Sequence, residues 1–492
     1  MGINLSIVIF LPFLAAAVLG VLRAPLPWLR AGAVVSSLIV LVLVLAAAVA
    51  FDPAGGMQFV RHLPWIASYG ISYYVGVDAL SLVVLLLIAV LMPLLYLYMW
   101  DESRKGYWYN MMLLQTGVTG AVLSLDLILF YLFWETMLLP VFIMIGRYGN
   151  GTRQGNAMKI VLMTVFGSMT MLFSILYMGY AHFEATGMRS FALGDLAAVL
   201  FDPTVSVWLA AGFLLAFAIK IPLLGLHTWL APAYGSAPTP AVVILSAVMA
   251  KLGAYGIWRF GYGLFGTTLH FYTPYITAMA LAGLLYFAVR AVMESDLKRM
   301  FAFASGSHLS LIALGIFTAN IYGWGGSLYF IATHALASAG IFMMIGLLYA
   351  RTGSFAIDDL GGLAQKAPRF AFFFVFFALC VAGLPGTGGF VGELLIILGA
   401  FKSGTVVGIF AATTVLAAML YIFWMLQRTV FGPAGQYAVS YRDLEGREMA
   451  VLIPLVLLLL VTGLAPSLFT PLFGTQLTEM LASPGFGLGG VW

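Results

Sequence analysis

Long apolar stretches separated by short polar breaks recur along the whole chain of 492 residues. A run of about 18 or more apolar residues is long enough to cross a lipid bilayer as a helix. The pattern therefore predicts an all-α polytopic membrane protein with about fourteen transmembrane helices. The predicted spans are 4–22, 31–51, 76–100, 109–125, 126–146, 158–182, 207–230, 241–264, 272–292, 298–318, 323–350, 371–400, 404–429 and 450–472.

The weakest division lies between the fourth and fifth spans, where only Ser124 and Asp126 interrupt the apolar run. Asp126, like Asp78 at the third span, stands where a helix begins and is expected to be an N-terminal cap. The separation of these two helices is the least secure boundary in the predicted topology.

Two of the predicted helices are interrupted by proline and glycine. The seventh contains Pro222, and the twelfth contains GLPGTGGF around Pro385. Broken helices in matching places of two halves are typical of inverted-repeat transporter folds, although glycine and proline are also common in ordinary membrane helices. We expect one membrane domain, 1–492, with N-terminal helices in 1–108, five-helix repeats in 109–264 and 272–429 (helices 4–8 and 9–13), and a C-terminal helix at 450–472.

The basic residues test this helix count independently. If the N-terminus lies outside, the predicted inside loops hold sixteen of the 22 lysines and arginines. The outside loops and edges hold four, which are Arg61, Arg189, Arg259 and Lys402. The remaining two, Lys220 and Lys251, lie within the predicted helices. Because basic residues favour the cytoplasmic side, this asymmetry supports fourteen helices with both termini outside.

Composition narrows the class of protein further. The chain is 63% hydrophobic and only 8% charged, which is too apolar to cover a soluble surface. Its single cysteine, Cys380, excludes a disulfide, a cysteine-based zinc site and an iron–sulfur cluster held by this chain. The basic residues form no run or stripe, so nucleic acid is not an expected partner.

Four ionisable residues fall near the middle of predicted membrane spans: Glu135 in the fifth, Lys220 in the seventh, Lys251 in the eighth and Glu393 in the twelfth. Each charge at a bilayer centre costs about 2.5–3.5 kcal/mol. Removal from water disfavours the charged forms of both lysine and carboxylate, which lets them exchange protons near neutral pH. The four residues indicate a chain of protonatable sites; the alternative is a buried pair, such as Glu135 with Lys220, that only joins two helices.

Three histidines could connect these sites. His227 follows Lys220 by seven residues, while His308 and His334 lie on consecutive predicted helices beside serines and threonines. Histidine readily relays protons, although a lone membrane histidine can instead form a hydrogen-bonded helix contact. We expect His227, His308 and His334 to contribute to a hydrated proton path.

Four motifs taken together resemble a known family. FYLFWETMLLP, FAIKIPLLGLHTWL, LSAVMAKLGAYGIWRFG and SDLKRMFAFASGSHLSL are similar to the antiporter-like membrane subunits of proton-pumping NADH:quinone oxidoreductase, respiratory complex I. The resemblance covers about residues 75 to 430. Most members carry lysine in the twelfth helix, whereas the chain M or subunit 4 branch carries glutamate, so Glu393 in GFVGEL resembles that branch.

The resemblance implies a proton-translocating membrane-arm subunit of this oxidoreductase (a translocase) that couples electron transfer to proton pumping. It implies that Glu135 and Lys220 form the coupling pair, Lys251 is the connecting lysine, and Glu393 is the outward terminal site. No redox centre is expected in this chain; NADH, flavin, iron–sulfur clusters and quinone are expected in partner subunits. The expected partners are other membrane-arm subunits, including other antiporter-like chains, the peripheral redox arm and the lipid bilayer.

One segment departs from the family pattern, and two other functions stay open. After HTWL the chain reads APAYGSAPTPAVV, with Pro232 and Tyr234 where the family usually has Asp and His. Related chains also occur in multisubunit sodium/proton antiporters and membrane-bound hydrogenases, and a haem enzyme with His308 and His334 as axial ligands is a third possibility. The expected location is the bacterial inner membrane with both termini on the outer, periplasmic side; an organellar energy-transducing membrane is the alternative.

Overall fold

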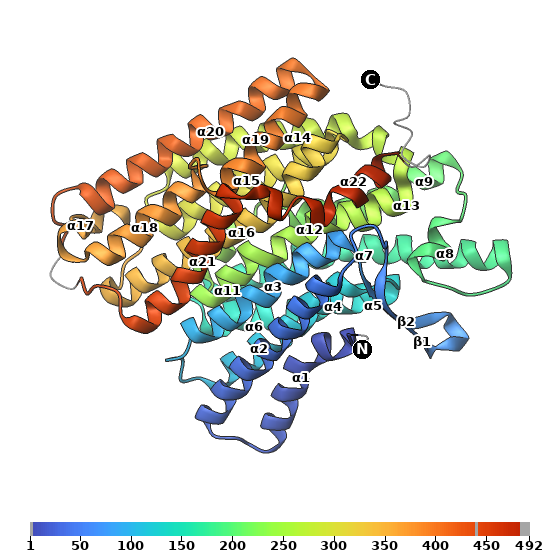
Figure 1. Ribbon diagram of the computed structural model, residues 1–492, viewed down its shortest axis with the longest axis horizontal. Coiled ribbons are helices and arrows are strands. Elements are labelled where there is room, and N and C mark those ends of the chain that lie inside the picture. The colour runs from blue at the N-terminus through green and yellow to red at the C-terminus, as the bar shows by residue number, and fades with distance from the viewer. Residues whose placement is uncertain (1–2, 438–440, 483–492) are drawn as a thin grey trace.

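The chain folds into a bundle of helices that run roughly along one common direction (Figure 1). The computed structural model describes residues 3–437 and 441–482. Among these residues, ten helices are long and apolar enough to cross a membrane. Each of the fourteen predicted ranges contains helical residues, and the mostly helical, polytopic membrane fold is confirmed, while the count of fourteen stays a prediction.

The helical segments have the following bounds: α1 Leu5–Val21, α2 Leu26–Ala50, α3 Ala79–Tyr98, α4 Lys105–Leu123, α5 Leu127–Thr136, α6 Leu138–Tyr148, α7 Arg153–Thr186, α8 Leu193–Ala197, α9 Pro203–Lys220, α10 Leu230–Ser236, α11 Thr239–Ile244, α12 Ala250–Gly256, α13 Gly263–Phe265, α14 Leu269–Met293, α15 Leu297–Phe317, α16 Ile321–Thr352, α17 Leu363–Lys366, α18 Pro368–Val381, α19 Gly388–Ser403, α20 Thr405–Leu426, α21 Gly446–Leu464 and α22 Pro471–Ala482. Two π-helical segments, Leu245–Met249 and Ile257–Tyr262, lie on either side of α12.

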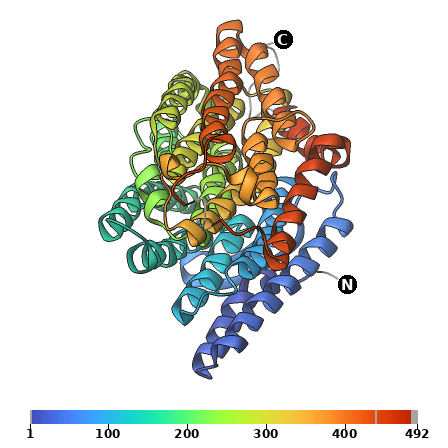
Figure 2. The ribbon, with the colours of Figure 1, turned by 90° about the vertical axis from the view of Figure 1, so that its left-hand side faces the viewer.

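Figure 2 shows the first helices, in blue, and the orange helices near residue 400 at opposite edges of the bundle. The helices α15 and α16 lie in the interior and are buried almost throughout.

One element differs from the all-α expectation. Strands β1 (Gln58–Ile66) and β2 (Ile71–Val77) form an antiparallel hairpin, and Gly70 makes its turn with a positive φ of 74°. The predicted third span began at residue 76 because Val75 to Val77 extend the apolar run. In the structure these residues finish a strand instead, and Asp78 caps α3 by accepting a hydrogen bond from the Ser81 backbone N–H.

The division between the fourth and fifth predicted helices is confirmed. The helix α4 ends at Leu123, and Asp126 caps α5 by accepting hydrogen bonds from the backbone N–H groups of Ile128 and Leu129. The same carboxylate also accepts bonds from the backbone and hydroxyl of Ser72 in the hairpin. One aspartate therefore separates two helices and anchors the hairpin to them.

Both predicted helix interruptions are present. The helix α9 stops at Lys220, and α10 starts only at Leu230. The helix α18 stops at Val381, and α19 starts at Gly388 after two glycines, Gly383 and Gly386, with φ of 75° and 90°. Glycine adopts this left-handed conformation without the steric cost that other residues meet.

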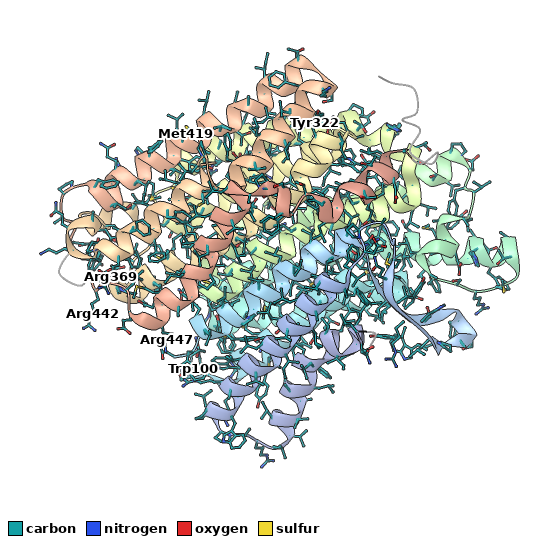
Figure 3. The ribbon with its side chains drawn as sticks, in the orientation of Figure 1. Trp100, Tyr322, Arg369, Met419, Arg442 and Arg447 are labelled. Atoms are coloured by element: carbon teal, nitrogen blue, oxygen red, sulfur yellow. The ribbon has the colours of Figure 1, made fainter. Side chains whose placement is uncertain are left out.

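The two ends of the bundle differ in charge. We call the end that carries β1 and β2 the hairpin face, and the opposite end, with the loops before α18 and α21, the basic face. Figure 3 shows Arg369, Arg442 and Arg447 at the basic face. There Arg447 pairs with Asp101, and this bond and charge lower the pKa of the Asp101 carboxyl.

Two loop structures on opposite faces have the same internal hydrogen bonds. SFALGDL (190–196) runs into α8 on the hairpin face, and SFAIDDL (354–360) precedes α17 on the basic face (Figure 1). In each, the hydroxyl of the first serine donates to the aspartate that immediately precedes the final leucine: Ser190 to Asp195 and Ser354 to Asp359, both at 2.6 Å. We call these the Ser–Asp latches. The first pairs with Asp126 before α5 and the second with Asp296 before α15, through matching isolated β-bridges.

Candidate functional site

The most concentrated group of buried ionisable side chains lies between three helices. His308 on α15, His334 on α16 and Glu393 on α19 are each at most 3% exposed. The Nε2 atom of His308 lies 3.4 Å from Oε1 of Glu393, and the His308 and His334 ring centroids are 5.1 Å apart. The three side chains therefore form one continuous polar contact inside the bundle, which we call the His–Glu cluster.

Several polar atoms of this cluster have no hydrogen-bond partner among the described residues. They are both ring nitrogens of His308, Nδ1 of His334 and Oε1 of Glu393, and the nearby hydroxyls of Ser305 and Ser338 share this property. An unsatisfied buried polar atom costs about 1–3 kcal/mol, and such groups in native proteins call for an explanation such as bound water or a catalytic role. These atoms are therefore available for hydrogen bonds that the described protein groups do not supply.

The break between α18 and α19 brings the backbone against Glu393. A Cβ atom placed on Gly383 would collide with Oε2 of Glu393. The carboxylate thus occupies the space that the missing side chain leaves. The interruption of the helix and the buried acid belong to the same local structure.

Lys251 is fully buried on α12, between the two π-helical segments. Its Nζ donates to the carbonyl of Ser246, and its charge acts on the rings of His308 and His334. Single π-helical turns occur often at functional sites, because they release backbone groups from the regular ladder. The helix that carries Lys251 packs against α15, which carries His308, and the role of Lys251 as the connecting lysine stays a prediction.

Lys220 ends α9 at the other break and is 3% exposed. Its ammonium lies 4.8 Å from the Trp134 ring centroid. Glu135 follows Trp134 on α5, is half-buried, and has one oxygen without a partner among the described residues. Glu135 and Lys220 influence each other electrostatically but form no ion pair in the described part of the chain.

His227 lies apart from the His–Glu cluster. It is half-buried in the loop between α9 and α10, where its ring packs against Tyr286 and Phe287 at 5.1 and 4.9 Å. Its Nδ1 accepts a bond of 3.2 Å from the Gly225 N–H. His227 lies in the break that follows Lys220, and its role as a proton relay stays a prediction.

The contact between His308 and His334 also bears on the haem alternative. Their rings meet in an edge-to-face arrangement at 5.1 Å, which leaves no room for a porphyrin between them. The pair is therefore unsuited to act as two axial ligands of one haem.

From the sequence, Lys298 is one of the sixteen basic residues assigned to the inside loops and Arg259 is one of the four assigned to the outside loops and edges. The structure shows that both are buried. Lys298 on α15 is 2% exposed and donates to the carbonyls of Gly235 and Ala237 at the end of α10, at 3.3 and 2.5 Å. Arg259 is 7% exposed and pairs with Asp78. The sequence signal that could have identified Arg259 as buried is its spacing from Lys251. Lys251, Tyr255 and Arg259 follow one another at intervals of four residues.

Comparison with known proteins places these features in a family. Residues 124–463 match the family model described as NADH:quinone oxidoreductase/Mrp antiporter, TM. The chain belongs to this family. Subunit M of the NADH-quinone oxidoreductase of Rhodobacter capsulatus is 35% identical over 99% of this chain and 98% of that protein.

Solved structures agree with the assignment. A chain of respiratory complex I from Thermus thermophilus, solved with bound NADH, superposes with a TM-score of 0.88 at 29% identity, covering 97% of this chain and all of that one. A chain of the Mrp complex from a Dietzia species gives a TM-score of 0.85 at 21% identity over 99% of both chains, which shows a shared fold. The family region includes Glu135 and Glu393 with every predicted site residue between them, whereas Asp78 and Gln476 lie outside it.

Proposed function

We propose that this chain is a proton-translocating subunit in the membrane arm of an NADH:quinone oxidoreductase. The observation that carries the proposal is the His–Glu cluster: His308 within 3.4 Å of Glu393, buried, with polar atoms free to bind water. Histidine and carboxylate in such contact can pass a proton between them. The name of the Rhodobacter capsulatus relative, subunit M of an NADH-quinone oxidoreductase, supports the assembly.

The proposed path starts at the break in α9. Lys220 holds or releases a proton according to the position of Glu135, because a nearby carboxylate stabilises the ammonium and its withdrawal favours the neutral amine. Lys251 exchanges the proton next. Water molecules complete the links between side chains that do not touch.

The second half of the path uses the His–Glu cluster. The proton passes by way of His308 and His334 to Glu393 beside the break at Gly383. Electron transfer in partner subunits supplies the energy, and those subunits carry the flavin, iron–sulfur clusters and the sites for NADH and quinone. The chain itself contributes proton-binding groups and their order in space.

The proposed setting is the inner membrane of a bacterium, with the hairpin face outside. Basic residues gather at the opposite face, as expected for the cytoplasmic side. Both ends of the described chain lie at the hairpin face: Tyr73 of β2 donates to Ser6 in the first turn of α1, and Gln476 of α22 contacts the start of α3. Both termini are accordingly assigned to the outer side.

We also propose that residues 109–264 and 272–429 are two inverted repeats. The two breaks occupy corresponding places in them. The Ser–Asp latches support this pairing, because they have matching sequences and bonds and lie on opposite faces. An inverted repeat places equivalent elements on opposite sides of the membrane.

A subunit of a sodium/proton antiporter is the second candidate function, because the family and the fold are shared with the Mrp complex. Glu393 in place of the lysine found in most antiporter-like chains favours the oxidoreductase. Sodium-driven proton exchange in vesicles without NADH or quinone would favour the antiporter. Copurification of flavin and iron–sulfur subunits with this chain would favour the oxidoreductase.

The proposal is tested in the intact complex reconstituted into liposomes. Lys220→Ala and Glu135→Ala should each abolish NADH-driven proton uptake while the complex still assembles, and Lys402→Ala, which changes an exposed lysine, should not. Proton transport is followed with a pH-sensitive dye and assembly by native gel electrophoresis. Full pumping in either site variant would rule out the proposed path.

A further inference from the structure

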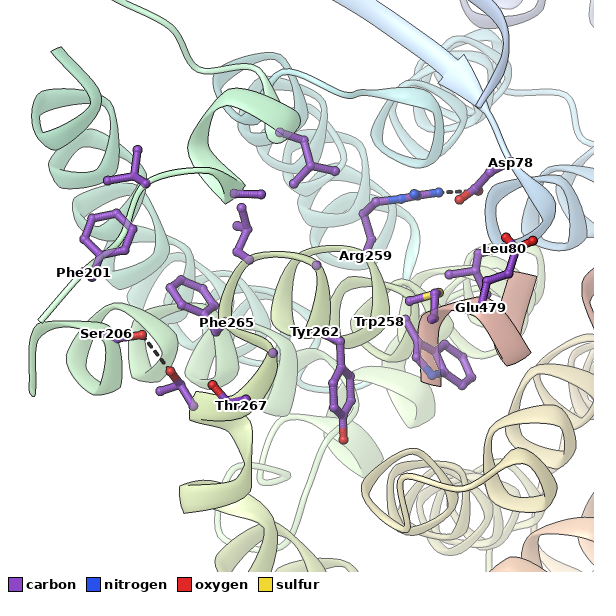
Figure 4. Close-up of a pocket in the computed structure, with 18 of the residues that line it drawn as sticks. Asp78, Leu80, Phe201, Ser206, Trp258, Arg259, Tyr262, Phe265, Thr267 and Glu479 are labelled. Carbon is purple, nitrogen blue, oxygen red and sulfur yellow. Dashed lines mark hydrogen bonds and ion pairs between the residues drawn. The ribbon is translucent and has the colours of Figure 1, made fainter. Parts of the chain in front are cut away.

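A cavity of about 980 Å³ indents the hairpin face (Figure 4). Its walls come from the loop before β1, the start of α3, the loop before α9, the π-helical segment Ile257–Tyr262, and α22. Its polar lining includes Asp78, Arg259, Gln476 and Glu479. Glu479 is exposed and lies at the cavity wall, so the cavity carries a charged group accessible to water.

The inner wall of this cavity is a buried ion pair. Arg259 donates through Nη2 to Oδ1 of Asp78, and the two side chains are only 7% and 3% exposed. Gln476 on α22 donates to the other carboxylate oxygen at 2.5 Å and accepts from the Ala79 N–H at 2.9 Å. The pair is thus held from α3, from the π-helical segment and from α22 together.

Behind the pair, polar groups continue to Lys251. Lys251, Tyr255 and Arg259 recur every four residues, which places them along one side of a helix. Nε of Arg259 donates to the Tyr255 hydroxyl at 3.0 Å, and that hydroxyl donates to the Val122 carbonyl at 2.7 Å. Neither Lys251 nor Tyr255 lines the cavity, so the ion pair separates the cavity from the buried lysine.

The charge of Arg259 suits a barrier to protons. Arginine stays protonated under all ordinary conditions, so it neither accepts a proton nor transmits one. Its fixed positive charge repels a proton that approaches from either side, and repulsion is stronger away from bulk water. Asp78 is already bound to Arg259, Gln476 and the Ser81 backbone, which leaves it poorly placed to accept a proton.

We propose that the cavity is a water-filled vestibule on the hairpin face, and that the Asp78–Arg259 pair is a barrier that keeps protons from leaking between it and Lys251. This inference rests on the proposed function, because Lys251 must exchange protons. It adds a second approach to the proton path, distinct from Glu393, that is closed in this structure. Asp78 and Arg259 are positioning residues that separate compartments and take no part in proton transfer.

The decisive variant is Asp78→Asn with Arg259→Gln in the intact complex. Asparagine caps helices as well as aspartate does, and removing both charges avoids leaving one charge buried alone. In liposomes with an imposed pH gradient and no NADH, the gradient should collapse roughly tenfold faster than in wild type, equivalent to about 1.4 kcal/mol of barrier. Arg259→Lys, which keeps the charge, should leak less than the double variant.

A leak through the proposed route must depend on Lys251. Adding Lys251→Met to the double variant should restore the slow wild-type leak, whereas a leak caused by a damaged bundle would persist. The exposed pair Asp101–Arg447 on the basic face provides the control: Asp101→Asn with Arg447→Gln should leave the leak unchanged. A leak that persists without Lys251, or no added leak at all, overturns the inference.

A milder variant covers the case in which the double variant does not assemble. Gln476→Leu removes one hydrogen bond to Asp78 from α22 and leaves the ion pair in place, and it should produce a smaller leak that again requires Lys251. The absence of such a leak would also overturn the inference. The leak measurements omit NADH, so they test the barrier separately from pumping. If wild type pumps normally and the variants do not leak, only the barrier is refuted. If wild type does not pump, or Lys220→Ala still pumps fully, the proposed function itself is refuted.

Discussion

The Lys220 ammonium lies over the face of the Trp134 ring, 4.8 Å from its centroid, and forms no ion pair with the neighbouring Glu135 in the described residues. A tryptophan face attracts a cation by about 0.5–2 kcal/mol, more when water is excluded. The ring therefore gives the lysine a second partner when the carboxylate is distant. We interpret this arrangement as the separated state of the coupling pair, with Trp134 holding the ammonium.

Replacing Trp134 by leucine should weaken the separated state. Without the ring, Lys220 is expected to stay closer to Glu135, so NADH-driven pumping should fall severalfold while the complex still reduces quinone. Trp134→Phe retains an aromatic face and should recover much of the loss. Trp208→Leu, at a 73% exposed position on α9, is the matched control, and equal pumping in Trp134→Leu and wild type would contradict the prediction.

Gly383 is expected to be far less tolerant of alanine than a glycine with the same backbone. Gly383 has φ of 75° and Gly353 has φ of 73°. A Cβ atom added to Gly383 would lie within 4 Å of the Glu393 side chain, whereas one added to Gly353 would meet no atom within that distance. Both substitutions should cost about 1–2 kcal/mol of unfolding free energy from the left-handed backbone. Gly383→Ala should cost more, and it should also displace Glu393.

The comparison of these two glycines uses two measurements. Thermal unfolding of the purified complex reports the shared backbone cost. Proton pumping reports the displacement of Glu393, so it should fall in Gly383→Ala and persist in Gly353→Ala. Normal pumping in Gly383→Ala would show that the exact place of the carboxylate does not matter.

Lys298 should stabilise the short helix that follows the Lys220 break. Its ammonium binds the last carbonyls of α10 and lies 4.8 Å from the Phe355 ring. Lys298→Met should leave those carbonyls unsatisfied and lower the free energy of unfolding by about 1–3 kcal/mol. Arg299→Met removes only a partly exposed pair with Glu294, where a loss of about 0–1 kcal/mol is expected; equal melting temperatures for the two variants would contradict the assignment.

The sequence predicts those parts of the site that contrast strongly with their surroundings. Lys220, Lys251 and Glu393 stand inside long apolar runs, where a charge has few explanations other than function. The helix breaks were also predictable, because proline and clustered glycine interrupt helices by their backbone chemistry alone. These features depend on local sequence, which one chain provides.

Features that depend on contacts between distant segments were not predictable in this way. Arg259 stands near the end of an apolar run and resembles an interfacial arginine until Asp78, 181 positions earlier, is found beside it. The hairpin was missed because its β-branched residues join the apolar run of α3. The contact of Lys220 with Trp134 requires the packing of α9 on α5, which apolar periodicity does not specify.

The Ser–Asp latches offer a test of the proposed repeats that does not involve the proton path. Ser190 and Ser354 each donate to an aspartate at 2.6 Å and accept a bond of 3.1 Å from the backbone N–H two residues later. If the latches are equivalent elements of two repeats, Ser190→Ala and Ser354→Ala should lower the free energy of unfolding by similar amounts, about 0.5–2 kcal/mol each. The double variant should show the sum, because residues on opposite faces are too far apart to interact. Thermal unfolding of the single and double variants measures this, and a large effect from one latch with none from the other would argue against their equivalence.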